Sequence, residues 1–256
     1  MTDVRSKALG LAWLMAAVGL AAAVALGLSP FIRRIPWSWE QAISHVVGSA
    51  PSNDACSNPR AEEAFTQLVA RLYPIDPEDD RYSIHVHIAP DPAVNAFAEL
   101  GGNITLNAGL LEQADSAEEV AGVLAHEIEH VRRRHILEGF VTHLMTTEGI
   151  RIVFSGGSVS NTRWTNYFLH MGFSRAQEAE ADEGALRRLQ KARIDNQGFK
   201  QFFERMKERA SVPSILSDHP SNHTRSEMTE KFENTDTTPV MTDQDWKTFK
   251  EYCQGN

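Results

Sequence analysis

The chain has no run of lysine and arginine interleaved with aromatic residues, and basic residues are the minority among its charges. It contains 25 Lys and Arg residues against 34 Asp and Glu residues, which gives a formal net charge of −9. Proteins that bind nucleic acid usually present a basic surface to the phosphate backbone. We therefore expect no nucleic acid among the partners. Hydrophobic residues make up 42% of the 256 positions, which is enough for a substantial core.

Charge is missing altogether from residues 8–28, whose sequence is ALGLAWLMAAVGLAAAVALGL. A helix of this length rises about 30 Å, the thickness of the hydrocarbon layer of a membrane. The run is longer than the apolar core of most signal peptides, and its end, VALGLSP, is a poor cleavage site. We therefore expect an uncleaved transmembrane signal-anchor over residues 1–34, with the lipid bilayer as its partner.

Cysteine is scarce: the chain contains only Cys56 and Cys253. Both follow the expected anchor, and no Leu-x-x-Cys motif precedes Cys56. An even number of cysteines behind an export signal indicates a disulfide. We expect a Cys56–Cys253 disulfide, with the N-terminus in the cytoplasm and the bulk of the chain outside it.

Residues 35–58 are predicted to be a juxtamembrane amphipathic segment and linker. Trp37 and Trp39 are residues that favour the membrane interface. The stretch SAPSNDACSNP that follows has the composition of a linker. Residues 59–256 then form the remaining domain.

Hydrophobic periodicity in that domain changes from helical to alternating and back. Residues 59–73 have apolar residues at helical spacing, whereas 82–89 (YSIHVHIA) alternate. The stretches AVNAFAE and NITLNAGLL follow, so we expect a small sheet of about three strands. Later helices begin with capping boxes at Ser116 and Ser174. The fold class is therefore α+β: a mainly helical domain with one small sheet, plus the N-terminal transmembrane helix.

The helix that begins at Ser116 contains LAHEIEHV, residues 124–131. His126 and His130 stand four apart and so lie on one face, where two imidazoles can bind one zinc ion. Glu127 lies near the same point without being a ligand, and it is expected to act as general base for the attacking water. A solvated charged helix face is the alternative, but the apolar stripe of this helix and the export signal favour a protease site.

A third ligand is needed. The pattern H-E-x-x-H-x-x-G-x-x-H is excluded because Arg133 and Ile136 stand at its Gly and last His positions. His135 is one residue off and is expected to be structural or solvent-facing. Two later glutamates are candidates. Glu148 has a suitable spacing but no ligand helix around it, whereas Glu178 lies in the first turn of a well-capped helix, so we choose Glu178.

Asp182 follows Glu178 by one turn on the same helix face. A carboxylate there can accept a hydrogen bond from the far nitrogen of a zinc-bound histidine and fix its tautomer. Glu180 and Glu183 are expected to point elsewhere.

Four segments of the chain resemble the membrane-associated zinc metallopeptidases that include the CAAX prenyl proteases, HtpX and periplasmic proteases of the BepA and LoiP type. These segments are VNAFAELGGNITLNAGLL, VLAHEIEHVRRRH, SRAQEAEAD and HPSNHTR. The resemblance covers about residues 60–230. It departs from the family pattern at Glu99-Leu100, where the family often has Leu-Pro, and this puts the turn and the substrate contacts there in doubt.

The resemblance implies a mainly helical gluzincin-type domain, whose sheet lies beside the active-site helix. It implies one Zn²⁺ per chain, held by His126, His130 and Glu178, with Glu127 as the base. It also implies that an extended protein or peptide substrate pairs with the strand around 103–107. The substrate-binding residues would then be Asn95, Asn103, Ile104 and Thr105.

The HPSNHTR segment is implied to lie near the metal through His219 and Arg225. His219 precedes Pro220, which biases its backbone toward an extended shape that can present the imidazole to the cleft. Two roles for His219 stay open. It either donates a hydrogen bond to the developing oxyanion or occupies the fourth position on zinc and keeps the enzyme idle.

Prenyl proteases have many membrane spans, whereas this chain is expected to have one, so the single-span periplasmic branch fits better. The resemblance then implies an endopeptidase of the bacterial inner membrane, with its catalytic domain facing the periplasm and a role in envelope protein quality control. The alternative is a non-catalytic, chaperone-like binding protein on the same scaffold. The intact Glu127 argues against it, because a binding protein needs no base.

Overall fold

The computed structural model describes residues 29–47, 59–74, 82–144, 167–208, 215, 219, 224–232 and 234–251. The expected membrane span at 8–28, Cys56, Cys253 and Glu148 lie outside these residues. Within them, none of the helices combines the length and the apolar character needed to cross a membrane.

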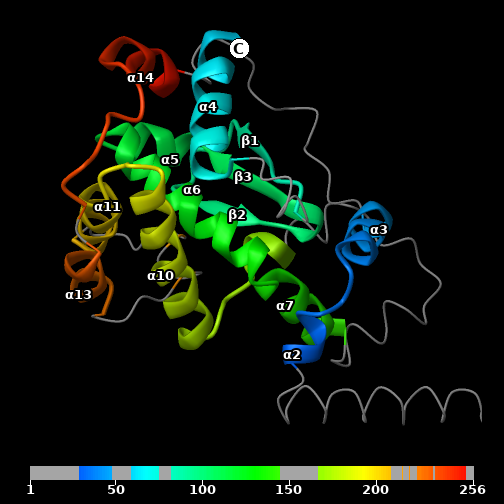
Figure 1. Ribbon diagram of the computed structural model, residues 1–256. Helices are drawn as coiled ribbons and strands as arrows, with labels where there is room; N and C mark the ends of the chain where they lie inside the picture. Colours follow the sequence, from blue (N-terminus) through cyan, green and yellow to red (C-terminus); the bar gives the residue numbers. More distant parts are fainter. Residues whose placement is uncertain are drawn as a thin grey trace, which may run out of the picture.

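Helices dominate the described part of the chain, and they surround one small sheet (Figure 1). This confirms the expected mainly helical domain with a small sheet of three strands. The helices before the sheet are α2 (Ser29–Ile32), α3 (Trp37–Val47) and α4 (Pro59–Leu72). Those after it are α5 (Ala108–Gln113), α6 (Ala117–Arg132), α7 (His135–Leu144), α10 (Arg175–Lys191), α11 (Gln197–Lys207), α13 (Thr224–Lys231) and α14 (Asp243–Lys250).

The sheet contains β1 (His85–Ala89), β2 (Ala96–Ala98) and β3 (Asn103–Asn107), in the order β1-β3-β2. Strand β3 pairs with β1 in parallel and with β2 in antiparallel orientation. The turn η1 (Leu100–Gly102) connects β2 to β3.

This strand order corrects one expectation. The strand 103–107 is central, and Ile104 and Thr105 each have a register partner on both sides. A substrate strand therefore cannot add to β3 along these residues, because both of its edges are occupied. Strand β2 is an edge strand, and it packs against α6.

Helix α6 is the centre of the core. Almost all of its residues are buried, as expected for a helix covered on every side. It packs most extensively against α10 and α11. Two glycines permit this close approach: a Cβ at Gly184 of α10 would lie 2.3 Å from Glu129 Oε2, and one at Gly122 of α6 would lie 2.6 Å from Phe199 Cβ.

Side-chain caps fix where the two central helices begin. Ser116 Oγ accepts a hydrogen bond from Glu119 N at 3.3 Å at the start of α6. Glu119 Oε2 accepts from the backbone N–H of Asp115, one residue before the cap, at 2.9 Å. Each bond satisfies a backbone donor that the helix itself leaves unpaired.

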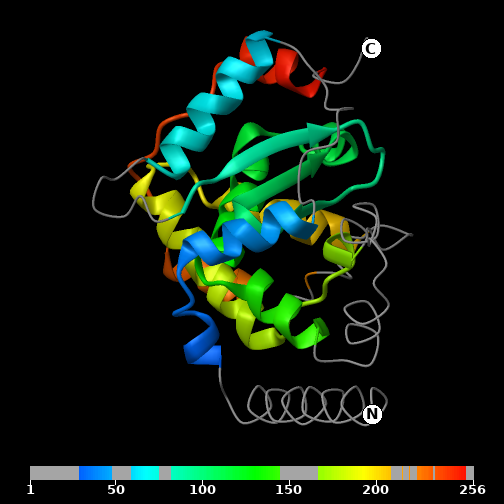
Figure 2. The ribbon, with the colours of Figure 1, turned by 90° about the vertical axis from the view of Figure 1, so that its right-hand side faces the viewer.

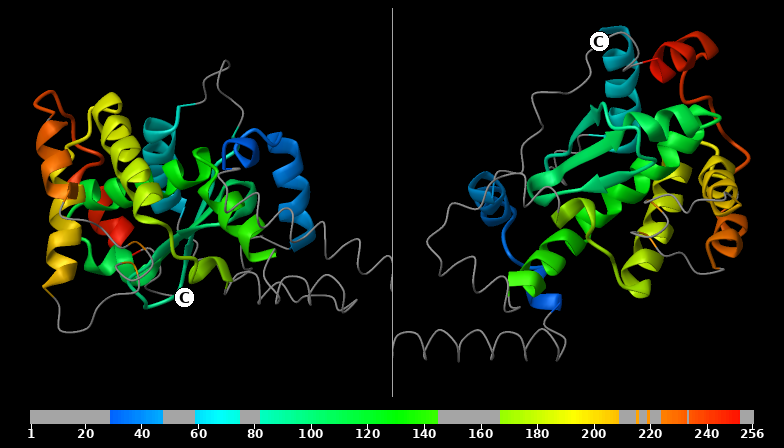
Figure 3. Two further views of the ribbon diagram at one scale, coloured as in Figure 1. Left: turned by 90° about the horizontal axis from the view of Figure 1, so that it is seen from below. Right: turned by 180° about the vertical axis from the view of Figure 1, so that it is seen from behind.

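Residues far apart in the sequence close the domain at both ends. Helix α14 lies beside α4, where Phe249 and Phe65 have ring centroids 5.5 Å apart (Figures 1 and 3). Helix α3 lies against η1 on the other side of the molecule, with Glu40 buried beneath it (Figure 2). Residues 29–47 thus pack on the same domain as the helices that follow.

Candidate metal centre

Helix α6 carries His126 and His130 on one face, and both side chains are buried. Their Nε2 atoms lie 2.9 Å apart. Because residues four apart in a helix lie one above the other, α6 alone is enough to bring the two rings together. The buried Glu127 side chain belongs to the same turn.

Helix α10 adds a carboxylate from its first turn. Ser174 Oγ accepts from Gln177 N at 3.3 Å, and Gln177 Oε1 accepts from Ser174 N at 2.9 Å, so the capping box fixes the start of α10. Glu178 then lies with Oε1 3.4 Å from His130 Nε2 and Oε2 3.6 Å from His126 Nε2.

His219 reaches the same point from the segment between α11 and α13. Its Nδ1 lies 3.2 Å from His126 Nε2 and 3.1 Å from Glu178 Oε1. Its Nε2 lies 3.4 Å from Glu127 Oε1. The buried ring of His219 thus stands between the ligand atoms and Glu127.

The four side chains fit one zinc ion. His126, His130, Glu178 and His219 each offer one donor atom, and these atoms all lie within 4.8 Å of one another. A tetrahedral zinc site with bonds of about 2.0–2.1 Å has donor atoms about 3.3 Å apart. The measured distances between donors run from 2.9 Å to 3.6 Å, which brackets that value. Imidazole nitrogen and carboxylate oxygen are also the ligand types that zinc takes.

The charges in the cluster suit metal binding. Burial lowers the pKa of His130 to about 3, despite the opposing effect of Glu178. Burial alone would raise the pKa of Glu178, but hydrogen bonds from His130 and His219 hold it well below its usual range. The cluster therefore combines a neutral imidazole with an ionised carboxylate, the forms in which these groups bind metal.

The outer nitrogens of the two α6 histidines face different partners. Asp182, one turn beyond Glu178 on α10, has Oδ1 3.0 Å from His126 Nδ1. His130 Nδ1 lies 3.1 Å from His135 Nδ1. A partner at this outer nitrogen orients a histidine ligand and fixes its tautomer.

His135 and Glu180 depart from what the sequence suggested. His135 is fully buried and contacts His130, so it is not solvent-facing. Glu180 does point away from His130, yet its Oε2 lies 3.3 Å from His135 Nε2. The sequence carried a signal in the single-residue offset of His135, but α6 ends at Arg132 and a new helix begins at His135, which breaks the helical spacing.

The remaining predicted residues lie elsewhere or outside the described side chains. Asn95 is buried just before the edge strand β2. Asn103, Ile104 and Thr105 are buried on the central strand, and the Asn103 side-chain amide donates to Leu100 O at 3.2 Å. Arg225 belongs to α13, but its side chain is outside the described part, as are Cys56, Cys253 and Glu148.

Comparison with known proteins finds a family match over most of the domain. The sequence model of the family described as Peptidase family M48 matches residues 63–232. This range contains all four donor residues of the cluster.

Individual relatives match over about half of the chain. The beta-barrel assembly-enhancing protease of Escherichia coli (strain K12) is 27% identical over 162 residues, covering 55% of this chain and 32% of that protein. The metalloprotease LoiP of the same organism is 31% identical over 152 residues, covering 56% of this chain and 59% of that protein. The mitochondrial metalloendopeptidase OMA1 of Arabidopsis thaliana is 33% identical over 150 residues, covering 57% and 31%. The aligned region thus spans about a third of the first and third of these relatives.

Proposed function

The chain belongs to peptidase family M48, and from this premise we propose that it is a zinc-dependent endopeptidase that hydrolyses peptide bonds in protein substrates. The observation that carries the proposal is the convergence of His126, His130 and Glu178 around one point beside Glu127. Two imidazoles, one carboxylate and an adjacent second carboxylate are the groups that hydrolysis by metal-activated water requires.

His126, His130 and Glu178 hold one zinc ion, which when bound polarises a substrate carbonyl and lowers the pKa of water. Glu127 takes the proton from the attacking water and later gives it to the departing amine. Its buried position on α6 supports this role, because a carboxylate in a low-dielectric site acts strongly on a nearby proton.

His219 holds the site in a resting state. Its Nδ1 stands at hydrogen-bond distance from two of the ligand atoms, where a fourth zinc ligand belongs. Water and substrate need that position, so the ring has to leave before hydrolysis begins. This arrangement favours the latch over the oxyanion donor, since a donor would face the substrate carbonyl rather than the ligand set.

Substrate binds in extended form along the edge strand β2, with Asn95 at the beginning of that strand. The strand order supports β2, because it is an edge strand and packs against α6, which carries the histidine pair. Backbone hydrogen bonds to an edge strand give affinity without strict sequence preference, which suits a protease with many substrates.

The protein is a single-span protein of a bacterial inner membrane, and its peptidase domain faces the periplasm in a role in envelope quality control. The uncharged run at 8–28 supports the anchor. One relative is named for the assembly of β-barrels, which in bacteria belong to the outer membrane. Alkaline phosphatase fused after the domain is expected to be active, because it folds only outside the cytoplasm; an inactive fusion of full length would place the domain inside.

A Cys56–Cys253 disulfide ties the two ends of the domain together in that compartment. A loop of roughly 200 residues would be stabilised by about 5 kcal/mol in the chain-entropy model. Mass spectrometry under non-reducing conditions should find the two cysteine peptides joined. Two free thiols in protein isolated from the periplasm would exclude the disulfide.

The full chain, purified in detergent, tests the enzymatic proposal directly. It should digest casein, lose this activity with a zinc chelator and recover it with zinc. Glu127→Gln should retain zinc but lose roughly 10²- to 10⁴-fold in rate, because the ligands remain while the base is gone. Glu112→Gln, at an exposed carboxylate on α5, is the matched control and should be as active as the wild type. Equal digestion by the Glu127→Gln variant and the wild type would refute the mechanism.

The chaperone-like alternative predicts a different pattern. The chain would then bind unfolded casein, and neither the wild type nor a His219→Ala variant would cleave it. The arrangement of His219 makes this second variant necessary, because a latched enzyme can be inactive for a reversible reason.

A further inference from the structure

The outer nitrogen of His130 faces a second imidazole rather than a carboxylate. His130 Nδ1 and His135 Nδ1 lie 3.1 Å apart, and both side chains are fully buried. Two ring nitrogens at this distance share one hydrogen, so one of them donates and the other accepts. No water is needed to bridge them at such a distance.

Metal binding decides which nitrogen donates. His130 turns its Nε2 toward His126 and Glu178, so a metal held there leaves the hydrogen of the His130 ring on Nδ1. His135 Nδ1 must then accept it, which places the hydrogen of the His135 ring on Nε2. That nitrogen lies 3.3 Å from Glu180 Oε2, a carboxylate oxygen that can accept it.

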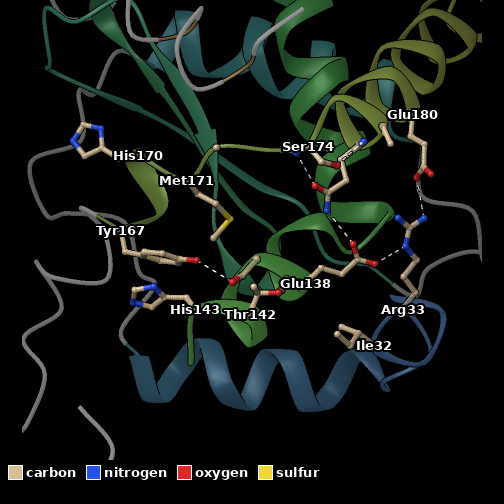
Figure 4. A pocket seen from close by; sticks show the side chains of 14 residues that line it. Ile32, Arg33, Glu138, Thr142, His143, Tyr167, His170, Met171, Ser174 and Glu180 are labelled. Carbon is tan, nitrogen blue, oxygen red and sulfur yellow. Dashed lines mark hydrogen bonds and ion pairs between the residues drawn. The ribbon is translucent and has the colours of Figure 1, made fainter. Parts of the chain in front are cut away.

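Arg33 holds the far end of this chain of contacts (Figure 4). Arg33 Nη1 donates to Glu180 Oε2 at 2.9 Å, and Arg33 Nε donates to Glu138 Oε1 at 2.6 Å. Gln177 Nε2 donates to the other oxygen of Glu138 at 2.9 Å. Glu180 is therefore held from outside by α2 while its Oε2 faces His135.

The backbone just before His135 is also held by the N-terminal segment. Arg134 has φ 66°, a left-handed conformation that is unfavourable for a residue with a side chain. Its guanidinium forms a buried ion pair with Glu40 of α3 and donates to Ile35 O. This turn sets where α7 begins, and so where the His135 ring lies.

We propose that His135, Glu180 and Arg33 are positioning residues that hold the metal ligand His130 in its binding orientation. The inference rests on the proposed role of His130 as a zinc ligand. It adds that residues 29–47 form part of the metal centre, because they supply Arg33 and anchor Arg134 through Glu40. None of the three positioning residues touches metal or substrate itself.

Three substitutions of His135 separate its two contacts. His135→Asn places an amide oxygen about where Nδ1 stands, so it keeps the acceptor for His130 and loses the contact with Glu180. His135→Gln reaches toward Glu180 and loses the acceptor. His135→Leu loses both. The zinc affinity of the purified full chain is measured by competition with a chelator, and cobalt-loaded protein reports ligand geometry in its visible spectrum.

The His135→Leu and His135→Gln variants should bind zinc roughly 10- to 100-fold more weakly than the wild type, the usual effect of losing such a partner. The His135→Asn variant should recover most of the affinity. Equal affinity in all four proteins, or recovery by Gln rather than Asn, would overturn the proposal. Wild-type protein that binds no zinc would instead overturn the proposed function, so the two failures are distinguishable.

A second pair of variants guards against misfolding at the buried His135. Glu180 is 38% exposed and Glu183, on the same helix, is 42% exposed, with its own ion pair to Arg187. Glu180→Gln should weaken zinc binding several-fold, whereas Glu183→Gln should leave it unchanged. A Glu180→Gln variant that lowers only the melting temperature of the metal-free protein would show a merely structural role and overturn the proposal.

Discussion

His126 and His130 stand one turn apart on α6 and are equally buried, yet the two sides of the metal centre are built differently. The His126 side is completed by Asp182, from the same helix as Glu178. The His130 side is completed by His135, which depends in turn on Glu180 and on Arg33.

This difference separates a self-contained side from a dependent one. A carboxylate such as Asp182 carries its own negative charge and strengthens the attached imidazole as a ligand. A neutral imidazole such as His135 accepts a hydrogen bond but adds no charge. Its orientation also requires α2 and α3 to stay in place, so a change in residues 29–47 reaches His130 and should leave the Asp182 side intact.

Breaking the ion pair beneath the dependent side should have the largest effect. Glu40→Ala should lower the free energy of unfolding by roughly 3–5 kcal/mol, because it leaves the buried Arg134 guanidinium unpaired. Urea unfolding measures it. Asp236→Asn breaks an exposed pair with Arg193 and should change that free energy by less than about 1 kcal/mol. Similar losses in the two variants would mean that α3 is not anchored as described.

The two sides can be compared directly through zinc affinity. Asp182→Ala should weaken binding by roughly 100-fold and His135→Leu by roughly 10-fold, because only the first removes a charge next to a ligand. Chelator competition under identical conditions measures both variants. A larger loss in the His135→Leu variant would reverse the comparison.

The latch should have the smallest effect of the three. His219→Ala should raise casein hydrolysis by roughly tenfold, if the latched state holds about nine-tenths of the molecules. Steady-state kinetics on the full chain measures the change. A fall of roughly 10²-fold would assign His219 to the oxyanion instead.

Sequence reasoning succeeded where the relevant contacts are local. The pair His126 and His130 follows from helical spacing, and Glu178 and Asp182 follow from the capping box at Ser174, which fixes where α10 begins. The alternation of 82–89 likewise indicated a strand, and the structure has β1 there.

It failed where contacts join distant parts of the chain. The position of His135 depends on a left-handed turn at Arg134, which periodicity does not predict. The pairing of Arg33 with Glu180 joins residues 147 positions apart. The strand order that makes β3 central is equally non-local, since β1 and β3 are parallel strands that cannot be joined by a tight hairpin.

The zinc content of the purified full chain tests the central claim most directly, namely that His126, His130 and Glu178 hold one metal ion. Mass spectrometry should find one zinc per chain in the wild type and in Glu148→Ala. It should find little zinc in Glu178→Ala, because that variant removes one of the ligands on which a zinc site depends. A Glu178→Ala variant with full zinc content beside a Glu148→Ala variant without zinc would contradict the account and move the third ligand to Glu148.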